Sequence, residues 1–188
     1  MTTVAVVYHS GYGHTAAQAN AVARGAAKVA GVEVLLLTAE EAGQKLELLD
    51  DADAIIFGSP TYMGSASAQF KAFMDASSKV WFTQGWKDKV AAGFTTSASQ
   101  SGDKLNTLIQ LAVFAAQHAM VWVGVGLMPG NNSSTGSVND LNRLGGFLGA
   151  LAQANSDQGP DVAPLASDLL TAEHLGERVA TVTKKLRG

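Results

Sequence analysis

The chain of 188 residues is 47% hydrophobic and 15% charged, the balance of an ordered globular protein rather than a disordered one. Its net charge of -3, without a basic stripe, argues against a nucleic-acid partner, and the absence of cysteine excludes disulfides, thiolate chemistry and Cys-ligated metals. No apolar run reaches the length of a membrane span, and no signal-peptide pattern is present. We therefore expect one cytoplasmic domain over residues 1–188 without membrane insertion, and the low charge suggests a homodimer or homotetramer.

Short apolar runs alternate with helical patterns along the chain. Five runs are almost continuously apolar, which is typical of parallel strands buried on both faces, and they cover residues 4–8, 32–37, 54–58, 90–95 and 121–125. Helical patterns cover residues 15–29, 39–49, 67–79 and 103–118, and a closing helix covers residues 170–186. This alternation predicts an α/β fold with a doubly wound five-stranded parallel sheet and helices on both faces. Ligands of such sheets bind outside the carboxyl ends of the strands.

Breaker and capping residues support these boundaries. Gly31 is expected to end the first helix, and Asp103 to cap the fourth. Residues 128–136 are too rich in breakers to form an element, and residues 158–161 turn the chain. The pattern over residues 145–153 fits either a helix or a short strand of small residues.

The segment between the first strand and the first helix has the features of an anion site. The first N–H groups of a helix lack partners within the helix and lie at the positive end of its dipole. Ser10 and Thr15 can add hydroxyl donors, while Gly11 and Gly13 allow close approach to the backbone. The loop has no Lys or Arg and matches neither the P-loop nor the dinucleotide fingerprint. Its spacing fits a phosphate site built from neutral donors or a plain βα turn.

Two further strand ends carry uncharged donors. Residues 58–65 follow the third strand and combine a proline, a threonine, a tyrosine and a methionine before Gly64. Residues 95–102 follow the fourth strand and are almost all small hydroxyl residues. Together with the first loop, they could surround a flat heterocycle that is rich in hydrogen-bonding groups, with its phosphate on the first loop.

These motifs resemble the flavodoxin-fold NAD(P)H:quinone oxidoreductases of the WrbA type. The similarity rests on residues 10–15 and 58–64 in the same order, is supported by residues 55–58, 75–81 and 176–180, and covers nearly the whole chain. It implies a flavodoxin-like fold with FMN as cofactor, NAD(P)H as electron donor and a quinone as acceptor. In that family the first loop binds the FMN phosphate, and the other two flank the isoalloxazine ring and the ribityl chain.

The resemblance assigns a role to each loop. The phosphate would be held by Ser10, Gly11, Tyr12, Gly13, His14 and Thr15. The flavin edge and face would be lined by Pro60, Thr61, Tyr62, Met63 and Gly64, and the other edge by Thr96, Ser97, Ala98, Ser99, Gln100 and Ser101. Tyr12 matches a family tyrosine near the nicotinamide, and Trp81 an aromatic residue of the quinone pocket. We expect His14 to offer its backbone N–H rather than its imidazole, and no residue to act as general acid or metal ligand.

The chain departs from the family pattern in three places. The family's glycine-rich third loop is Ser-Ala-Ser-Gln-Ser here, over residues 97–101. A family histidine near the flavin falls on Gln117, with His118 next to it. An insertion that longer members carry near Glu40 and Glu41 is absent. The third-loop contacts, the approach of Gln117 or His118 to the flavin, and tetrameric assembly therefore stay open.

Three functions fit these features. The favoured one is an FMN-dependent NAD(P)H:quinone oxidoreductase that transfers two electrons, and the alternatives are a flavodoxin-type one-electron carrier and an FMN-binding protein without quinone reductase activity. A carrier needs carboxylates near the flavin to disfavour its reduced anion. None lies within the three loops, and Asp103 is the nearest in sequence. No Arg in the loops marks a 2′-phosphate site, so NADH and NADPH both fit.

Overall fold

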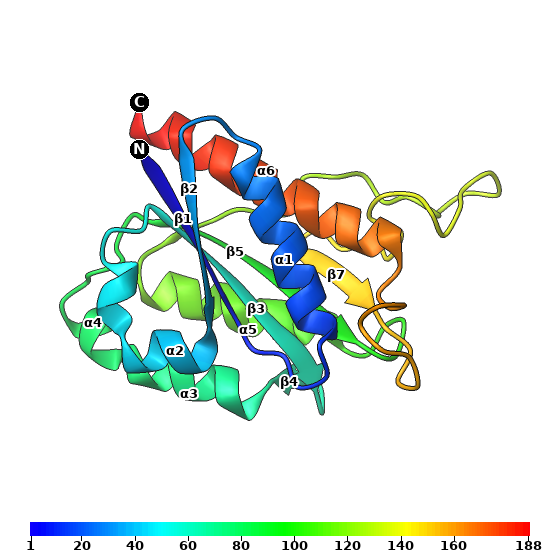
Figure 1. The fold of residues 1–188 in the computed structure, drawn as a ribbon, viewed down its shortest axis with the longest axis horizontal. Coiled ribbons are helices and arrows are strands. Elements are labelled where there is room, and N and C mark those ends of the chain that lie inside the picture. The colour runs from blue at the N-terminus through cyan, green and yellow to red at the C-terminus, as the bar shows by residue number, and fades with distance from the viewer.

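The computed structural model describes residues 1–188 and arranges them as a mainly parallel sheet between two layers of helices (Figure 1). The strands are β1 (Thr2–Tyr8), β2 (Val32–Thr38), β3 (Ala54–Tyr62), β4 (Ser65–Ala66), β5 (Val90–Ser97), β6 (Val121–Trp122) and β7 (Ala150–Gln153). The helices are α1 (His14–Ala27), α2 (Ala39–Gln44), the 3-10 helix η1 (Leu46–Leu49), α3 (Ala68–Ala76), α4 (Ser78–Phe82), α5 (Lys104–Gln117) and α6 (Ala166–Arg187). The strand order is β2-β1-β3-β5-β6, with β7 also on β5 and β4 on β3.

The predicted doubly wound sheet is confirmed, but its fifth position is shared by two segments. The strand expected over residues 121–125 shrinks to β6, which pairs with the start of β5, while β7 pairs with the end of β5. After β6 the chain turns away from β5, and the Val125 N–H donates to the carbonyl of Phe147, which precedes β7. Gly124 permits this crossing, because a Cβ there would lie 2.6 Å from the Phe147 oxygen. The ambiguous segment over residues 145–153 therefore ends in a strand.

Other boundaries also differ from the sequence prediction. β3 and β5 run on to Tyr62 and Ser97, so the polar residues expected in loops begin as strand. The helix expected over residues 39–49 divides into α2 and η1, and that over 67–79 into α3 and α4. Asp103 stands before α5 with φ of 56° and makes no side-chain cap, so the predicted capping role is wrong. The closing helix begins earlier than expected, at Ala166.

Alternate residues of the central strands supply two separate apolar cores. Val4 and Val6 of β1 face α1 and α6, whereas Ala5 and Val7 face α2, α3 and α5. Each strand is therefore apolar on both sides, which explains its nearly continuous hydrophobic sequence. An aromatic cluster that includes Phe57 fills the second core.

The first and last helices touch through their backbones. A Cβ at Gly25 of α1 would lie 1.8 Å from the Glu173 carbonyl oxygen, and one at Gly176 of α6 would lie 1.9 Å from that of Val22. Only glycine allows this approach. Figure 1 shows the two helices side by side over one face of the sheet, with both chain ends at the same edge.

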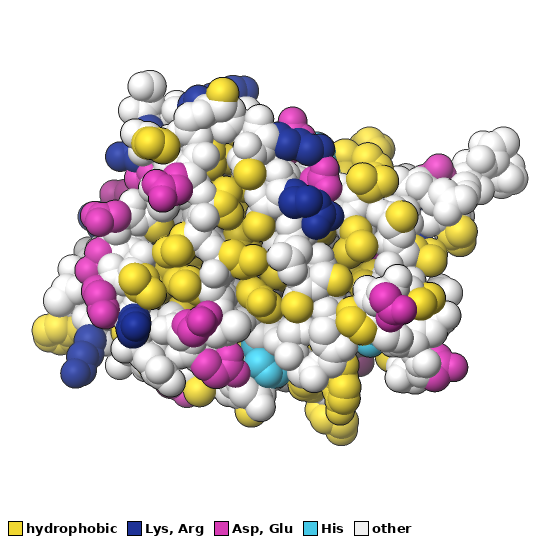
Figure 2. All heavy atoms as spheres, viewed as in Figure 1, with side chains coloured by type: hydrophobic (Ala, Val, Ile, Leu, Met, Phe, Trp, Pro, Cys, Tyr) yellow, Lys and Arg dark blue, Asp and Glu magenta, His cyan; other side chains and the backbone are white.

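The surface over α1 and α6 carries charges of both signs. Figure 2 shows Lys and Arg side chains scattered among acidic ones on this face, without a continuous basic stripe. None of the helices has the length and apolarity needed to cross a bilayer.

Candidate functional site

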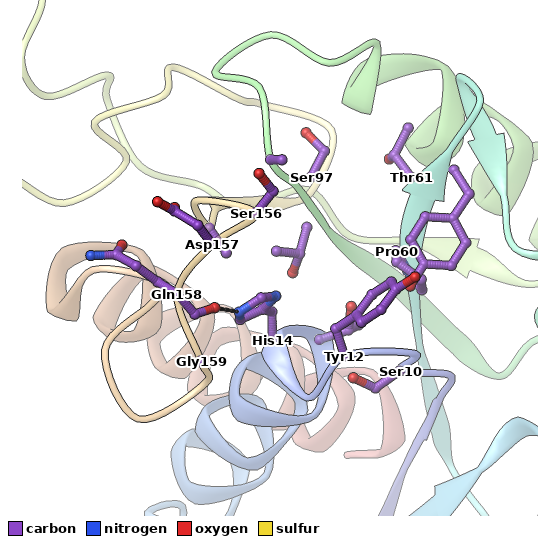
Figure 3. A pocket seen from close by; sticks show the side chains of 15 residues that line it. Ser10, Tyr12, His14, Pro60, Thr61, Ser97, Ser156, Asp157, Gln158 and Gly159 are labelled. Carbon is purple, nitrogen blue, oxygen red and sulfur yellow. Dashed lines mark hydrogen bonds between the residues drawn. The ribbon is translucent and has the colours of Figure 1, made fainter.

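A cavity of about 700 Å³ opens where β1, β3, β5 and β7 end. This is the edge at which parallel α/β sheets bind ligands. Figure 3 shows side chains from all these strand ends around it. Most of the predicted contact residues line the cavity: Ser10, Tyr12, His14, Thr15, Pro60, Thr61, Tyr62, Thr96, Ser97 and Ala98. The structure thus brings together parts of all three loops that the sequence singled out.

The remaining predicted residues do not line this cavity: Gly11, Gly13, Met63, Gly64, Ser99, Gln100 and Ser101. The side chain of Met63 is fully exposed. Gln100 and Ser101 line a different cavity on the other side of the third loop. The two glycines still shape the first loop, because a Cβ at Gly11 would lie 2.5 Å from the Tyr62 hydroxyl and Gly13 has φ of 89°.

The start of α1 offers backbone donors that have no partner within the protein. Ala17 is the first residue whose N–H bonds back, to the Gly13 carbonyl at 2.9 Å, and the helix has no side-chain cap. The N–H groups of His14, Thr15 and Ala16 make no hydrogen bond in the chain. Unpartnered amides at a helix N-terminus suit an anion, and no neighbouring cation is required.

A fourth loop, residues 154–159, completes the cavity and was missed by the sequence analysis. Its lining residues are Ala154, Ser156, Asp157, Gln158 and Gly159. It joins the first loop through His14, whose Nε2 lies 2.7 Å from the Gln158 carbonyl oxygen (Figure 3). A carbonyl only accepts, so this nitrogen donates. The imidazole, for which we expected no binding role, therefore links the first and fourth loops by a hydrogen bond.

The fourth loop also brings a carboxylate to the site. Asp157 is the one acidic side chain among the lining residues. The first three loops hold no carboxylate, and the fourth loop adds this one to the cavity. The sequence analysis did not identify β7 as a strand that runs parallel to β5. With that strand identified, the polar residues that follow it would have been expected at the same end of the sheet as the other three loops.

Two threonine hydroxyls of the cavity wall are bonded to protein partners. The Thr61 hydroxyl donates to Thr107 at 2.8 Å and lies 2.8 Å from the Thr95 hydroxyl. The Thr96 hydroxyl donates to Gln18 Oε1 at 2.7 Å. These hydroxyls join the strand ends to each other and to the helices α1 and α5.

An aromatic pair stands at the first and second loops. The rings of Tyr12 and Tyr62 are 6.3 Å apart at 72°, an edge-to-face contact. Burial raises the pKa of Tyr62, Tyr12 adds to the rise, and a hydrogen bond from the Gly11 backbone opposes it. Tyr12 is 77% exposed, so it offers its ring to an incoming flat molecule.

A buried lysine holds the third loop from behind. Lys104 Nζ donates to Ser97 Oγ at 2.8 Å and to the carbonyls of Ser99 and Gln100 at 2.7 and 2.8 Å. Burial lowers the pKa of this amine to about 8, while the nearby Asp168 acts in the opposite direction. This role could not be predicted from the sequence, where Lys104 has only the pattern of an ordinary first-turn residue of a helix.

Three residues considered for the flavin or quinone site lie away from this cavity: Trp81, Gln117 and His118. They share a second cavity of about 510 Å³ between the α3–α4 region and α5, and none of them lines the first cavity. Burial lowers the pKa of His118 to about 4, so this imidazole is neutral at physiological pH. The quinone-pocket role of Trp81 stays a prediction.

The fold and this cavity define the class of protein. An uncharged cradle of free amides, an aromatic pair and polar strand ends fit a phosphate joined to a flat ring, within the usual volume of small-molecule sites. These are the requirements of FMN on a doubly wound sheet, where the binding edge lies at the strand-order reversal. The chain is a flavodoxin-like, FMN-binding protein.

Comparisons with known proteins give the family. The model described as "NADPH-dependent FMN reductase" matches residues 35–133. A protein named flavodoxin FldP from Pseudomonas aeruginosa is 44% identical over 99% of both chains. One named NAD(P)H dehydrogenase (quinone) from Geotalea uraniireducens is 31% identical and covers 97% of this chain and 98% of its own. The solved structure of a flavodoxin, WrbA-like protein from Agrobacterium tumefaciens superposes with a TM-score of 0.76 at 42% identity, covering 98% and 99% of the two chains.

The chain belongs to the NADPH-dependent FMN reductase family of flavodoxin-like proteins. The resemblance to WrbA-type proteins drawn from the sequence is thereby confirmed, and an oxidoreductase that uses FMN is the activity class of this family.

Proposed function

We propose that this protein passes two electrons from NAD(P)H to a quinone through a bound FMN. The observation that carries the proposal is the composition of the cavity wall, where Asp157 is the one carboxylate among fifteen lining residues. A one-electron carrier requires acidic groups around the flavin, because like charge disfavours the reduced anion. Asp157 is itself exposed, so solvent screens its charge.

The residues of this chain would divide the work of binding. FMN, when bound, supplies the hydride chemistry, and the protein contributes position and electrostatics. The free amides of His14, Thr15 and Ala16 would hold the phosphate. Tyr12 and Tyr62 would border the ring and shield it from water, and the nicotinamide and the quinone would occupy the space beside Tyr12 in turn.

A flavodoxin-type electron carrier is the second candidate. It is favoured by the relative at 44% identity, which is named a flavodoxin. The relative at 31% identity, named a quinone dehydrogenase, favours the enzyme. The carrier requires a stable one-electron-reduced flavin, whereas the enzyme requires direct two-electron reduction, so a redox measurement separates the two functions.

The test starts from the purified chain loaded with FMN. Reductive titration with dithionite is followed by absorbance, and steady-state rates are measured with NADH or NADPH and a panel of quinones. The enzyme predicts direct passage to the two-electron-reduced flavin and turnover that depends on both substrates. Accumulation of stable one-electron-reduced flavin, without nicotinamide oxidation, would assign the carrier role instead.

A further inference from the structure

Lys104 is a buried cation with all its hydrogen bonds inside one loop. Its side chain is buried, and its three ammonium protons have three acceptors: the Ser97 hydroxyl and the carbonyls of Ser99 and Gln100. The Ser97 hydroxyl in turn donates a hydrogen bond to the Ser99 carbonyl at 3.0 Å. The third loop is thus wrapped around a charged group, and this group stays protonated at neutral pH.

The charged side chains that face Lys104 leave an excess of one positive charge. Arg143 makes a two-pronged ion pair with Asp168, at 2.8 Å from Nε and 2.7 Å from Nη2. Both side chains are buried, with 5% and 2% exposure. Asp168 also accepts the Gln153 N–H at the end of β7. With two cations and one carboxylate, the buried group carries a net charge of +1.

This charge lies directly behind the cavity wall. Ser97 lines the cavity and also bonds to the Lys104 ammonium, so one hydroxyl separates the cation from the space that a cofactor would fill. Lys104 and Arg143 also line the cavity on the other side of the third loop, but Lys104 is only 1% exposed and the Arg143 side chain 5%, so water screens their charge weakly. The position is not one that helix chemistry favours, since a cation in the first turn of α5 opposes the helix dipole.

We propose that Lys104 is a positioning residue that holds the third loop and, through the buried positive charge, stabilises the two-electron-reduced, anionic form of FMN relative to the oxidised form. This inference rests on the proposed function, because it requires FMN in the cavity at the first loop. It explains how a site without a cation in its lining can still favour two-electron reduction.

The test compares Lys104→Gln with wild type and with a matched control, Lys89→Gln. Lys89 also donates to two backbone carbonyls, those of Asp50 and Ala52, but it lies at the other end of the strands, just before β5 begins. Dissociation constants for oxidised and reduced FMN are measured by fluorescence and anaerobic titration, and the midpoint potential by spectroelectrochemistry. Lys104→Gln should weaken binding of reduced FMN at least tenfold more than binding of oxidised FMN. This ratio lowers a two-electron potential by about 30 mV.

Lys89→Gln should leave the ratio and the potential unchanged, and Lys104→Arg should keep both near wild type. Equal weakening of both redox forms by Lys104→Gln would show a loop support without an electrostatic role and would overturn the inference. Failure of wild type to bind FMN would refute the proposed function instead, so the two failures are distinct.

A measurement on wild type covers the case in which Lys104→Gln does not fold. Burial lowers the pKa of the Lys104 ammonium, which lies near Arg143 and Asp168, to about 8, and an anionic, reduced flavin beside it should raise this pKa. Reduction then takes up one further proton above that pH. Above that pH the slope of the midpoint potential against pH should therefore become steeper by about 30 mV per pH unit. An unchanged slope between pH 7 and 10 would overturn the inference.

Discussion

His118 is kept neutral in the core, and we predict that it makes the protein sensitive to acid. Its ring lies 4.4 Å from that of Trp86 and 4.9 Å from that of Phe114. The Ser77 hydroxyl donates its one proton to the Met74 carbonyl at 2.7 Å, so His118 Nε2 donates to Ser77 at 2.9 Å. Nδ1 is then a buried acceptor without a partner. A proton on Nδ1 would bring a charge into this apolar site, and burial accordingly lowers the pKa to about 4.

The sign and size of the effect follow from proton linkage. The folded-state pKa lies below the unfolded value of 6.5, so the unfolded chain binds more protons between pH 6.5 and 4. The free energy of unfolding contributed by His118 is therefore complete above pH 6.5 and is lost as the pH falls through this window. At about 1.4 kcal/mol per pKa unit, the loss approaches 3 kcal/mol, a large share of the stability of a typical domain.

Urea unfolding at pH 7.0, 5.5 and 4.5 measures this loss directly. His118→Phe retains an aromatic ring but does not titrate, and it should cost about 1 kcal/mol at pH 7 through the lost hydrogen bond. It should nevertheless be more stable than wild type at pH 4.5, so the two stability curves cross. Phe70→Leu, in the same aromatic cluster but without a contact to His118, should run parallel to wild type. Parallel curves for His118→Phe and wild type would refute the reasoning.

Two substitutions test the walls of the cavity. Gly13→Ala forces a side chain onto φ of 89° and places its Cβ 2.8 Å from Pro160. The free energy of unfolding in urea titrations should fall by about 1–2 kcal/mol, and FMN affinity should fall as well. Unchanged affinity would contradict the shaping role of this glycine. Thr61→Val removes the hydroxyl shared by Thr95 and Thr107 and should cost about 1–3 kcal/mol of stability, yet change FMN affinity less than threefold by fluorescence; a large loss of affinity would show that this hydroxyl also serves the ligand.

The sequence predicted the sheet well wherever the strands are apolar and missed their polar ends. The runs over residues 54–58 and 90–95 identify β3 and β5, because both faces of these strands are covered by helices. The strands continue through Thr61 and Thr96, whose hydroxyls are satisfied by side chains distant in sequence. Partners of this kind are set by tertiary packing and leave no local pattern.

The cofactor site was predicted in part for a related reason. The first loop is contiguous, with its glycines and hydroxyls in one short motif, so resemblance and local chemistry both identified it. The fourth loop follows β7, a strand of only four residues, two of them alanine, that owes its conformation to pairing with Phe94–Ser97. The contribution of Lys104 depends on the path of the third loop, which composition alone does not specify.

The glycine contact between α1 and α6 bears on how the protein is made. On the ribosome, α1 emerges well before Gly176 and the rest of α6. Until α6 has emerged, one apolar side of the nascent sheet stays uncovered, since Val22 of α1 packs with Leu175 and Val179 of α6. This side of the fold is therefore completed only after α6 has been synthesised, and chains that terminate before residue 166 are expected to be clients for chaperones or proteases.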